Sequence, residues 1–160
     1  MTFDMSEESD WVGPPVDIEM IRRAEDVLQV RLPKTYVDLL FVQNGGILSN
    51  RCFPTRFPTS WASDHVCIDA IWGVGGVYGV DVTSPGMITE WGYPEIGVVF
   101  GLTPSGGHDT VMFDYTSCGS NGEPSISYVD EDRVPRRIAN SFSEFLHGLV
   151  SCRGYGDDAD

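Results

Sequence analysis

His108 and Asp109 form the adjacent pair in this sequence whose side chains could do chemistry. An imidazole and a carboxylate together can bind a divalent metal ion, or can act as the general acid and base of a hydrolase. A metal centre needs further ligands, and only His65 and His147 remain as histidines. The simpler interpretation is that the two preceding glycines turn the chain and that the Asp109 carboxylate bonds to nearby backbone amides. We therefore predict no metal and no cofactor, and a hydrolase using His108 and Asp109 is the least favoured function.

The other nucleophilic side chains form no recognisable site. Cys52, Cys67, Cys118 and Cys152 are widely spaced and contain no CxxC pair, which argues against a zinc site and a secreted disulfide framework and predicts four reduced thiols. Triad partners need not be close in sequence, so spacing selects no nucleophile and no catalytic residue is assigned. The glycines at 73–79 fit the dinucleotide fingerprint poorly, because Tyr78 stands where the third glycine belongs.

The formal net charge of -14 narrows the class of partner. Residues 57–132 contain no Lys or Arg, while acidic residues recur throughout that stretch. Such a surface repels phosphate backbones and attracts basic partners over about 8 Å at physiological salt, so direct nucleic-acid binding is disfavoured. The alternative is that the charge only keeps the protein soluble. No apolar stretch approaches the roughly 20 residues of a membrane span and the start lacks a signal peptide, so we expect a cytoplasmic location.

The residue pair lies in a segment that predicts the centre of a sheet. In residues 96–115, two apolar runs flank a Pro-Ser-Gly-Gly turn, which predicts a strand, a loop and a returning strand. In the second run Val111 and Phe113 alternate with Met112 and Asp114, the period of a strand with two unlike faces.

Helices are predicted before this segment. Asp17 is predicted to cap a helix over about residues 18–29, with Ile18, Ile21, Ala24, Val27 and Leu28 on one face. Pro33 begins a second helix, whose apolar stripe is Tyr36, Val37, Leu39, Leu40 and Phe41. Asn44-Gly45-Gly46 ends this helix, and we predict a backbone with positive φ there. An irregular crossing over 47–58 and a strand over 66–72 follow. A single helical turn is then predicted over residues 84–91, capped by Ser84, with Pro85 at its first position and Gly92-Tyr93-Pro94 at its end.

The remaining elements are a strand and a closing helix. Residues 125–130 alternate as a strand does, and Ser141 with Glu144 forms the capping box of a helix. The buried face of that helix is predicted to be Phe142, Phe145, Leu146, Leu149 and Val150. The prediction is one α+β domain over residues 17–153, with an acidic arm over 1–16 that Phe3 and Trp11 dock, and an acidic tail over 154–160.

Four motifs, in this order, resemble the SUKH superfamily, the Smi/Knr-like family of yeast cell-wall regulators and bacterial immunity proteins. They are the helix at 21–28 followed by Arg31-Leu32-Pro33, the second helix running into Asn44-Gly45-Gly46, the hairpin with Ser105-Gly106-Gly107-His108-Asp109 and Phe113-Asp114, and the closing Ser141-Phe142-Ser143-Glu144-Phe145-Leu146. The resemblance implies an α+β domain with a mixed, mainly antiparallel sheet and flanking helices. The acidic arm and His108 depart from the family pattern.

The resemblance implies binding rather than catalysis. Bacterial members look like immunity proteins that neutralise a toxin, often a nuclease, of a polymorphic toxin system. An acidic protein would be steered to such a basic toxin domain. The alternative is a regulatory scaffold that binds a cellular protein, and the oligomeric state stays open. We expect the partner to dock on a face that includes some of Glu90, Trp91, Tyr93, Glu95, Asp109 and Asp114.

Overall fold

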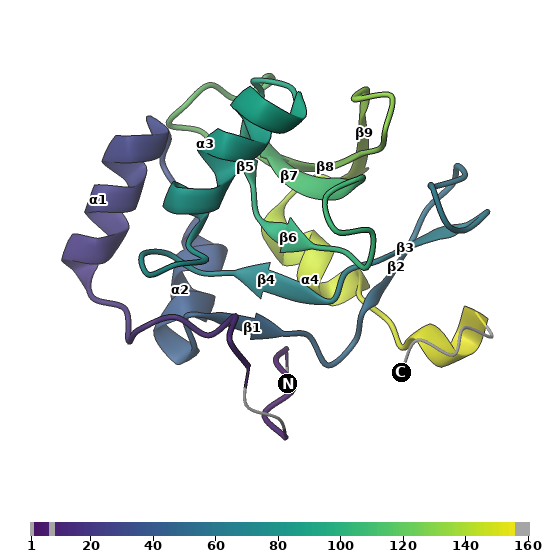
Figure 1. The fold of residues 1–160 in the computed structure, drawn as a ribbon, viewed down its shortest axis with the longest axis horizontal. Coiled ribbons are helices and arrows are strands. Elements are labelled where there is room, and N and C mark those ends of the chain that lie inside the picture. Colours follow the sequence, from purple (N-terminus) through teal and green to yellow (C-terminus); the bar gives the residue numbers. More distant parts are fainter. Residues whose placement is uncertain (1, 7–8, 156–160) are drawn as a thin grey trace.

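A computed structural model describes residues 2–6 and 9–155, and within these residues every strand pair is antiparallel. The strands form three sheets, with the orders β1-β4-β6, β2-β3 and β5-β7-β8-β9 (Figure 1). The predicted α+β class is confirmed. The elements are α1 (Ile18–Leu28), α2 (Lys34–Val42), β1 (Gly45–Ile47), β2 (Cys52–Pro54), β3 (His65–Cys67), β4 (Ala70–Trp72), α3 (Val80–Trp91), β5 (Gly97–Val99), β6 (Gly101–Leu102), β7 (Thr110–Asp114), β8 (Ser125–Val129), β9 (Pro135–Ala139), α4 (Phe142–Gly148) and the 3-10 turn η1 (Cys152–Tyr155).

The predicted hairpin forms, but its first strand serves two sheets. β5 pairs with β7, while β6 pairs with β4 in the other sheet. Phe100 lies between them, donating its N–H to Val111 and accepting from the N–H of Trp72. β7 is an interior strand as predicted, yet both of its faces are buried, so the predicted alternation of two unlike faces is wrong. A strand alternates between polar and apolar side chains only when one of its faces is exposed to solvent, whereas other parts of the domain cover both faces of β7.

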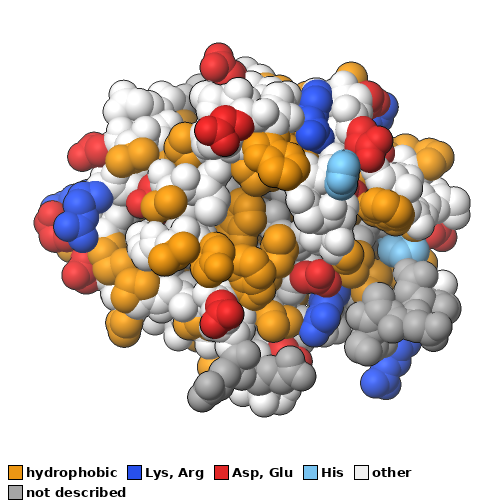
Figure 2. Space-filling model, viewed as in Figure 1, with side chains coloured by type: hydrophobic (Ala, Val, Ile, Leu, Met, Phe, Trp, Pro, Cys, Tyr) orange, Lys and Arg blue, Asp and Glu red, His pale blue; other side chains and the backbone are white. Residues whose placement is uncertain are grey.

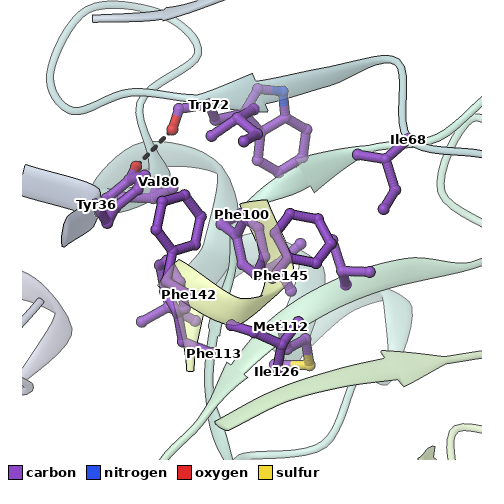
Figure 3. Close-up of a cluster of buried hydrophobic side chains, with 14 of the residues drawn as sticks. Tyr36, Ile68, Trp72, Val80, Phe100, Met112, Phe113, Ile126, Phe142 and Phe145 are labelled. Carbon is purple, nitrogen blue, oxygen red and sulfur yellow. Dashed lines mark hydrogen bonds between the residues drawn. The ribbon is translucent and has the colours of Figure 1, made fainter. Parts of the chain in front are cut away.

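An aromatic cluster joins the sheets to the helices. Phe100 stacks on Phe113 with ring centroids 4.2 Å apart, and Phe142 of α4 meets both rings edge-on. Tyr36 of α2 packs on the same cluster, and its hydroxyl donates to the carbonyl of Trp72 (Figure 3). Burial of several aromatic rings in edge and stacked contacts makes this cluster the main hydrophobic core.

Two of the three predicted helix caps are present. The Asp17 carboxylate accepts the N–H of Met20 at 2.9 Å, and the Ser141 hydroxyl accepts the N–H of Glu144 at 3.1 Å. The predicted apolar faces contain too many residues, because α1 and α2 each bury only a narrow stripe of side chains against the rest of the domain. The side chains predicted to be buried but found exposed are Ile18, Val27, Phe41 and Val150.

The prediction for residues 84–91 was wrong. A 12-residue helix, α3, begins after Gly79, and Pro85 lies inside it. Ser84 is not a cap: it is buried, and its hydroxyl accepts the N–H of Val99 at 2.9 Å. Proline is common at a helix start, so its position misled the prediction. Gly92 ends the helix with a φ of 76°, as predicted.

Short strands were also missed. The segment 47–58 was predicted to be irregular but contains β2 and the end of β1, and the single strand predicted over 66–72 is divided into β3 and β4. β9 was not predicted, because Pro135 and two arginines give an edge strand a polar composition.

Asn44 links three segments around the predicted helix end. Its side chain donates to the carbonyls of Pro14 and Val74 and accepts the N–H of Val74. Gly45 follows with a φ of 84°, as predicted for this position, and a Cβ there would lie 2.7 Å from the backbone nitrogen of Gly73. The Asn-Gly-Gly motif therefore fastens the arm, the end of α2 and the loop after β4 together.

The arm lies against the domain. Phe3 is buried and forms a backbone bridge with Leu48, and Trp11 packs on Tyr78. At the other end, Gly154 and Tyr155 belong to η1, and the rest of the predicted tail lies outside the described residues.

The prediction of four reduced thiols was wrong. Cys52 of β2 and Cys152 of η1 form a disulfide across a sequence separation of 100 residues. Spacing rules detect local cysteine patterns, whereas this pair meets only when the chain has folded. Within residues 2–6 and 9–155, no helix has the length and hydrophobicity of a membrane span.

Candidate protein-binding groove

A groove with an aromatic lining runs between α3 and the turn at residues 103–109. Its volume is about 380 Å³. Figure 2 shows hydrophobic side chains gathered in the middle of this face, with acidic side chains and some Lys or Arg side chains at the edge. We call this site the aromatic groove; its lining residues are Trp11, Trp72, Tyr78, Thr83, Gly86, Met87, Glu90, Trp91, Gly101, Leu102, Thr103, Gly106, Gly107 and Asp109.

Two aromatic walls close the groove. Trp91 ends α3, is 50% exposed, and rests on Gly107, where a Cβ would lie only 2.9 Å from its ring. Trp11 of the arm and Tyr78 of the loop after β4 pack with ring centroids 4.6 Å apart. Trp and Tyr rings of this kind are typical anchors for a protein partner because they bring large contact areas with few rotatable bonds.

Trp72 contributes a polar atom beside these walls. The side chain belongs to β4 and is buried, and its Nε1 has no hydrogen-bond partner within residues 2–6 and 9–155. An indole N–H without an acceptor is costly in a buried position. The lining of the groove therefore contains an unsatisfied donor.

The buried side chain of Asp109 holds the turn at residues 103–109 through hydrogen bonds. Its Oδ1 accepts the hydroxyls of Thr103 and Ser105, both at 2.7 Å, and its Oδ2 accepts the hydroxyl of Tyr128 at 2.7 Å. We expected backbone amides as partners; hydroxyl groups take that place because Asp109 points into the domain, where Tyr128 of β8 reaches it. The carboxylate is buried, so it shapes the groove rather than presenting a charge at the surface.

His108 points elsewhere. Its side chain is exposed and lies 3.5 Å from a carboxylate oxygen of Glu131. The fold therefore does not join His108 and Asp109 in one site. Among the described residues, the three-residue group of potential metal ligands consists of Cys52, Cys67 and Cys152, far from this pair in sequence.

Tyr93 is buried behind the turn. Its hydroxyl donates to the carbonyl of Gly107 at 2.6 Å, and the guanidinium of Arg133 lies 3.9 Å from its ring centroid. Arg133 also donates to the carbonyls of Trp91 and His108. Burial raises the pKa of Tyr93 to about 12. Tyr93 and Arg133 thus hold the end of α3 and the turn in place.

The other two predicted contact residues lie outside the aromatic groove. Glu95 is exposed and lines a second groove of about 460 Å³ between α1, α3 and β5. Asp114 is half-buried and accepts the N–H and hydroxyl of Thr116 and the hydroxyl of Ser127. Of the six predicted contact residues, Glu90, Trp91 and Asp109 line the aromatic groove, and of these three Glu90 and Trp91 are exposed.

Among the groove residues that sequence reasoning missed are Trp11 and Tyr78. Each lies in a segment rich in glycine or proline, where a large aromatic residue cannot be assigned to a face by periodicity. The usable signal was the presence of these rings in segments predicted to be loops, because an aromatic residue in an exposed loop often serves binding.

Comparison with known proteins identifies the family. A family model, SUKH_6, described as SMI1-KNR4 cell-wall, matches residues 18–146. This range includes α1 to α3, strands β1 to β9, most of α4 and every lining residue of the aromatic groove except Trp11. No curated protein and no solved structure matched the chain. Since the family model covers most of the sequence, the chain belongs to the SMI1-KNR4 cell-wall family of the SUKH superfamily.

Proposed function

We propose that this protein is a non-catalytic immunity protein that neutralises a toxin by binding a basic domain of that toxin in the aromatic groove. Family membership supports a general immunity or protein-binding role. The observation that carries the finer proposal is the position of Trp91, which is half exposed at the mouth of an apolar groove with exposed Glu90 beside it.

The charge around the groove favours a basic partner. No Lys or Arg occurs between residues 57 and 132, a stretch that supplies the groove lining except Trp11. The nearest following cation, Arg133, is engaged with Tyr93 and with backbone carbonyls. Acidic groups of this kind raise the association rate with a basic protein and disfavour nucleic acid.

The aromatic rings favour insertion of a cationic side chain. A Lys or Arg side chain lying across a Trp or Tyr ring gains cation–π attraction, and its alkyl stem fits an apolar wall. Glu90 is the exposed carboxylate among the lining residues and would meet the charged end. Tyr93 and Asp109 are buried in the free protein, so we assign them to support of the groove instead of contact.

The identity of the partner distinguishes an immunity protein from the alternative function, a regulatory scaffold. An immunity protein meets its toxin in the cytoplasm, so the proposal carries that location with it. A scaffold would bind a protein of the host cell instead, with the same groove and without protection from a toxin.

The test is to identify a toxin domain that this protein binds, starting with any toxin gene next to its own, and to co-express the two proteins. The protein should restore growth, and Trp91→Ala should abolish both rescue and complex formation while the variant stays folded. Trp61→Ala is the matched control, because Trp61 is 70% exposed and does not line the groove. Full rescue by Trp91→Ala, or binding without any protection, would contradict the proposal. In the second case a host protein captured through the same groove would favour the scaffold.

A further inference from the structure

Three cysteine sulfurs gather where β2, β3 and η1 meet. The Sγ atoms of Cys52, Cys67 and Cys152 all lie within 4.8 Å of one another. Cys52 and Cys152 form the disulfide and are buried, whereas Cys67 remains a thiol and is half-buried. A thiol beside a disulfide is the arrangement that thiol–disulfide exchange requires.

The strand register places Cys67 directly opposite Cys52. The N–H and the carbonyl of Cys52 both bond to Val150, on the other side of β2. Cys52 and Cys67 are therefore a non-hydrogen-bonded pair, in which Cα atoms lie about 4.5 Å apart and the side chains approach closely. Disulfides accept Cα separations of roughly 4.4–6.8 Å, so Cys52 has two possible partners.

We propose that these cysteines form a thiol–disulfide exchange site in which Cys52 alternates between Cys152 and Cys67. The Cys67 thiolate attacks Sγ of Cys52, the Cys52–Cys67 bond forms, and the Cys52–Cys152 bond breaks with Cys152 leaving as a thiolate. One disulfide is lost and one is gained, so the step needs no oxidant or reductant.

Asp69 is placed to take the proton. The S–H of Cys67 is directed at Oδ1 of Asp69, with the two atoms 3.7 Å apart. Burial raises the pKa of this carboxyl, which makes it a better acceptor. The departing Cys152 thiolate then gains a proton from solvent.

Exchange would change how η1 is attached. With the present disulfide, η1 is covalently tied to β2. After exchange it would be held by the two backbone hydrogen bonds between Cys52 and Val150 and by the stacking of Tyr155 on His65, whose ring centroids are 4.0 Å apart. The disulfide partner of Cys52 would therefore decide whether η1 is covalently attached to β2.

Disulfide mapping tests the proposal in the full chain. A Cys118→Ser background removes the exposed thiol outside the cluster. Trypsin then places Cys52, Cys67 and Cys152 on three different peptides, because it cleaves after Arg51, Arg56, Arg133, Arg137 and Arg153. After incubation at about pH 8 and an acid quench, mass spectrometry should find both Cys52–Cys152 and Cys52–Cys67 peptides. The matched Cys67→Ser variant should contain only the first.

A second variant tests the proposal even if the exchange equilibrium strongly favours the Cys52–Cys152 disulfide. In Cys152→Ser, oxidised glutathione should form the Cys52–Cys67 bond. Absence of that bond in both the parent and Cys152→Ser would overturn the proposal. So would a purified protein with three reduced thiols holding one zinc ion, since the cluster would then be a metal site.

Discussion

The hydroxyl of Tyr128 donates a 2.7 Å hydrogen bond to Oδ2 of Asp109 and so connects β8 to the turn below the aromatic groove. The same carboxylate accepts the hydroxyls of Thr103 and Ser105. The turn contributes Gly107 to the lining of the groove, where it contacts the ring of Trp91. The hydrogen bonds of the buried Asp109 carboxylate therefore help to fix the position of Gly107 relative to Trp91.

Tyr128→Phe should lower the free energy of unfolding by about 1–3 kcal/mol, because it leaves a buried carboxylate oxygen without its donor. Urea denaturation measures the change. Tyr78→Phe is the matched control: the Tyr78 side chain is exposed and its hydroxyl has no hydrogen-bond partner among the described residues, so the change should be within about 0.5 kcal/mol. Equal effects of the two variants would show that the Asp109 bond contributes nothing to stability.

Asn44→Ala should loosen the arm as well as destabilise the domain. The substitution leaves the N–H of Val74 and the carbonyls of Pro14 and Val74 without their side-chain partner, at a cost of about 1–3 kcal/mol for each buried group. Hydrogen exchange should speed up at the N–H of Val74, and the fluorescence of Trp11 should shift toward that of a water-exposed indole. A variant with unchanged exchange at Val74 would contradict the assigned role.

Stability should fall at high pH through Tyr93. Its pKa in the folded protein is about 12, above the ordinary value of 10.0, so the folded state holds the proton more tightly than the unfolded state. The contribution is complete below pH 10 and is lost as the pH rises toward 12. Tyr93→Phe should flatten the pH dependence of unfolding in that range, measured by thermal melts. Tyr78→Phe serves as the control and should leave the slope unchanged.

Glu90 and Trp91 should affect binding in different ways. Once a basic partner is in hand, Glu90→Gln should slow association and weaken its salt dependence between about 50 and 300 mM salt. Trp91→Ala should cost about 2 kcal/mol or more, mainly as faster dissociation. Stopped-flow or surface-based kinetics separates the two rates.

Two charge controls locate the binding surface. Glu95→Gln removes a charge from the second groove, and Asp26→Asn removes one from the exposed side of α1. Neither should match the effect of Glu90→Gln. An association rate that is indifferent to salt and to Glu90 would remove the steering argument, even if the complex is tight.

Local signals in the sequence were enough to predict the ends of the helices. Asp17, Ser141 and Gly92 act through bonds and torsions within a few residues, so their roles were confirmed. Pro85 was misread because a proline inside a helix has the same local signature as one at its start. The polar strand β9 is held by its pairing with β8, which periodicity cannot reveal.

The groove was predictable only in part. Glu90 and Trp91 lie close in sequence to the predicted hairpin, and their placement beside its turn follows from α3. Trp11 and Tyr78 are separated by more than sixty residues and meet through the fastening at Asn44. The Cys52–Cys152 bond is a similar case, since contacts of long sequence separation are set by tertiary packing.

Trp11 has a consequence for how such a protein can evolve. One wall of the groove comes from the arm, whereas the aromatic core around Phe100 and Phe113 comes from the sheets and helices. Substitutions at Trp11 can therefore reshape the groove while the ring contacts between Phe100 and Phe113 stay in place. Under the proposed function, an immunity protein built in this way can follow a changing toxin without losing its fold.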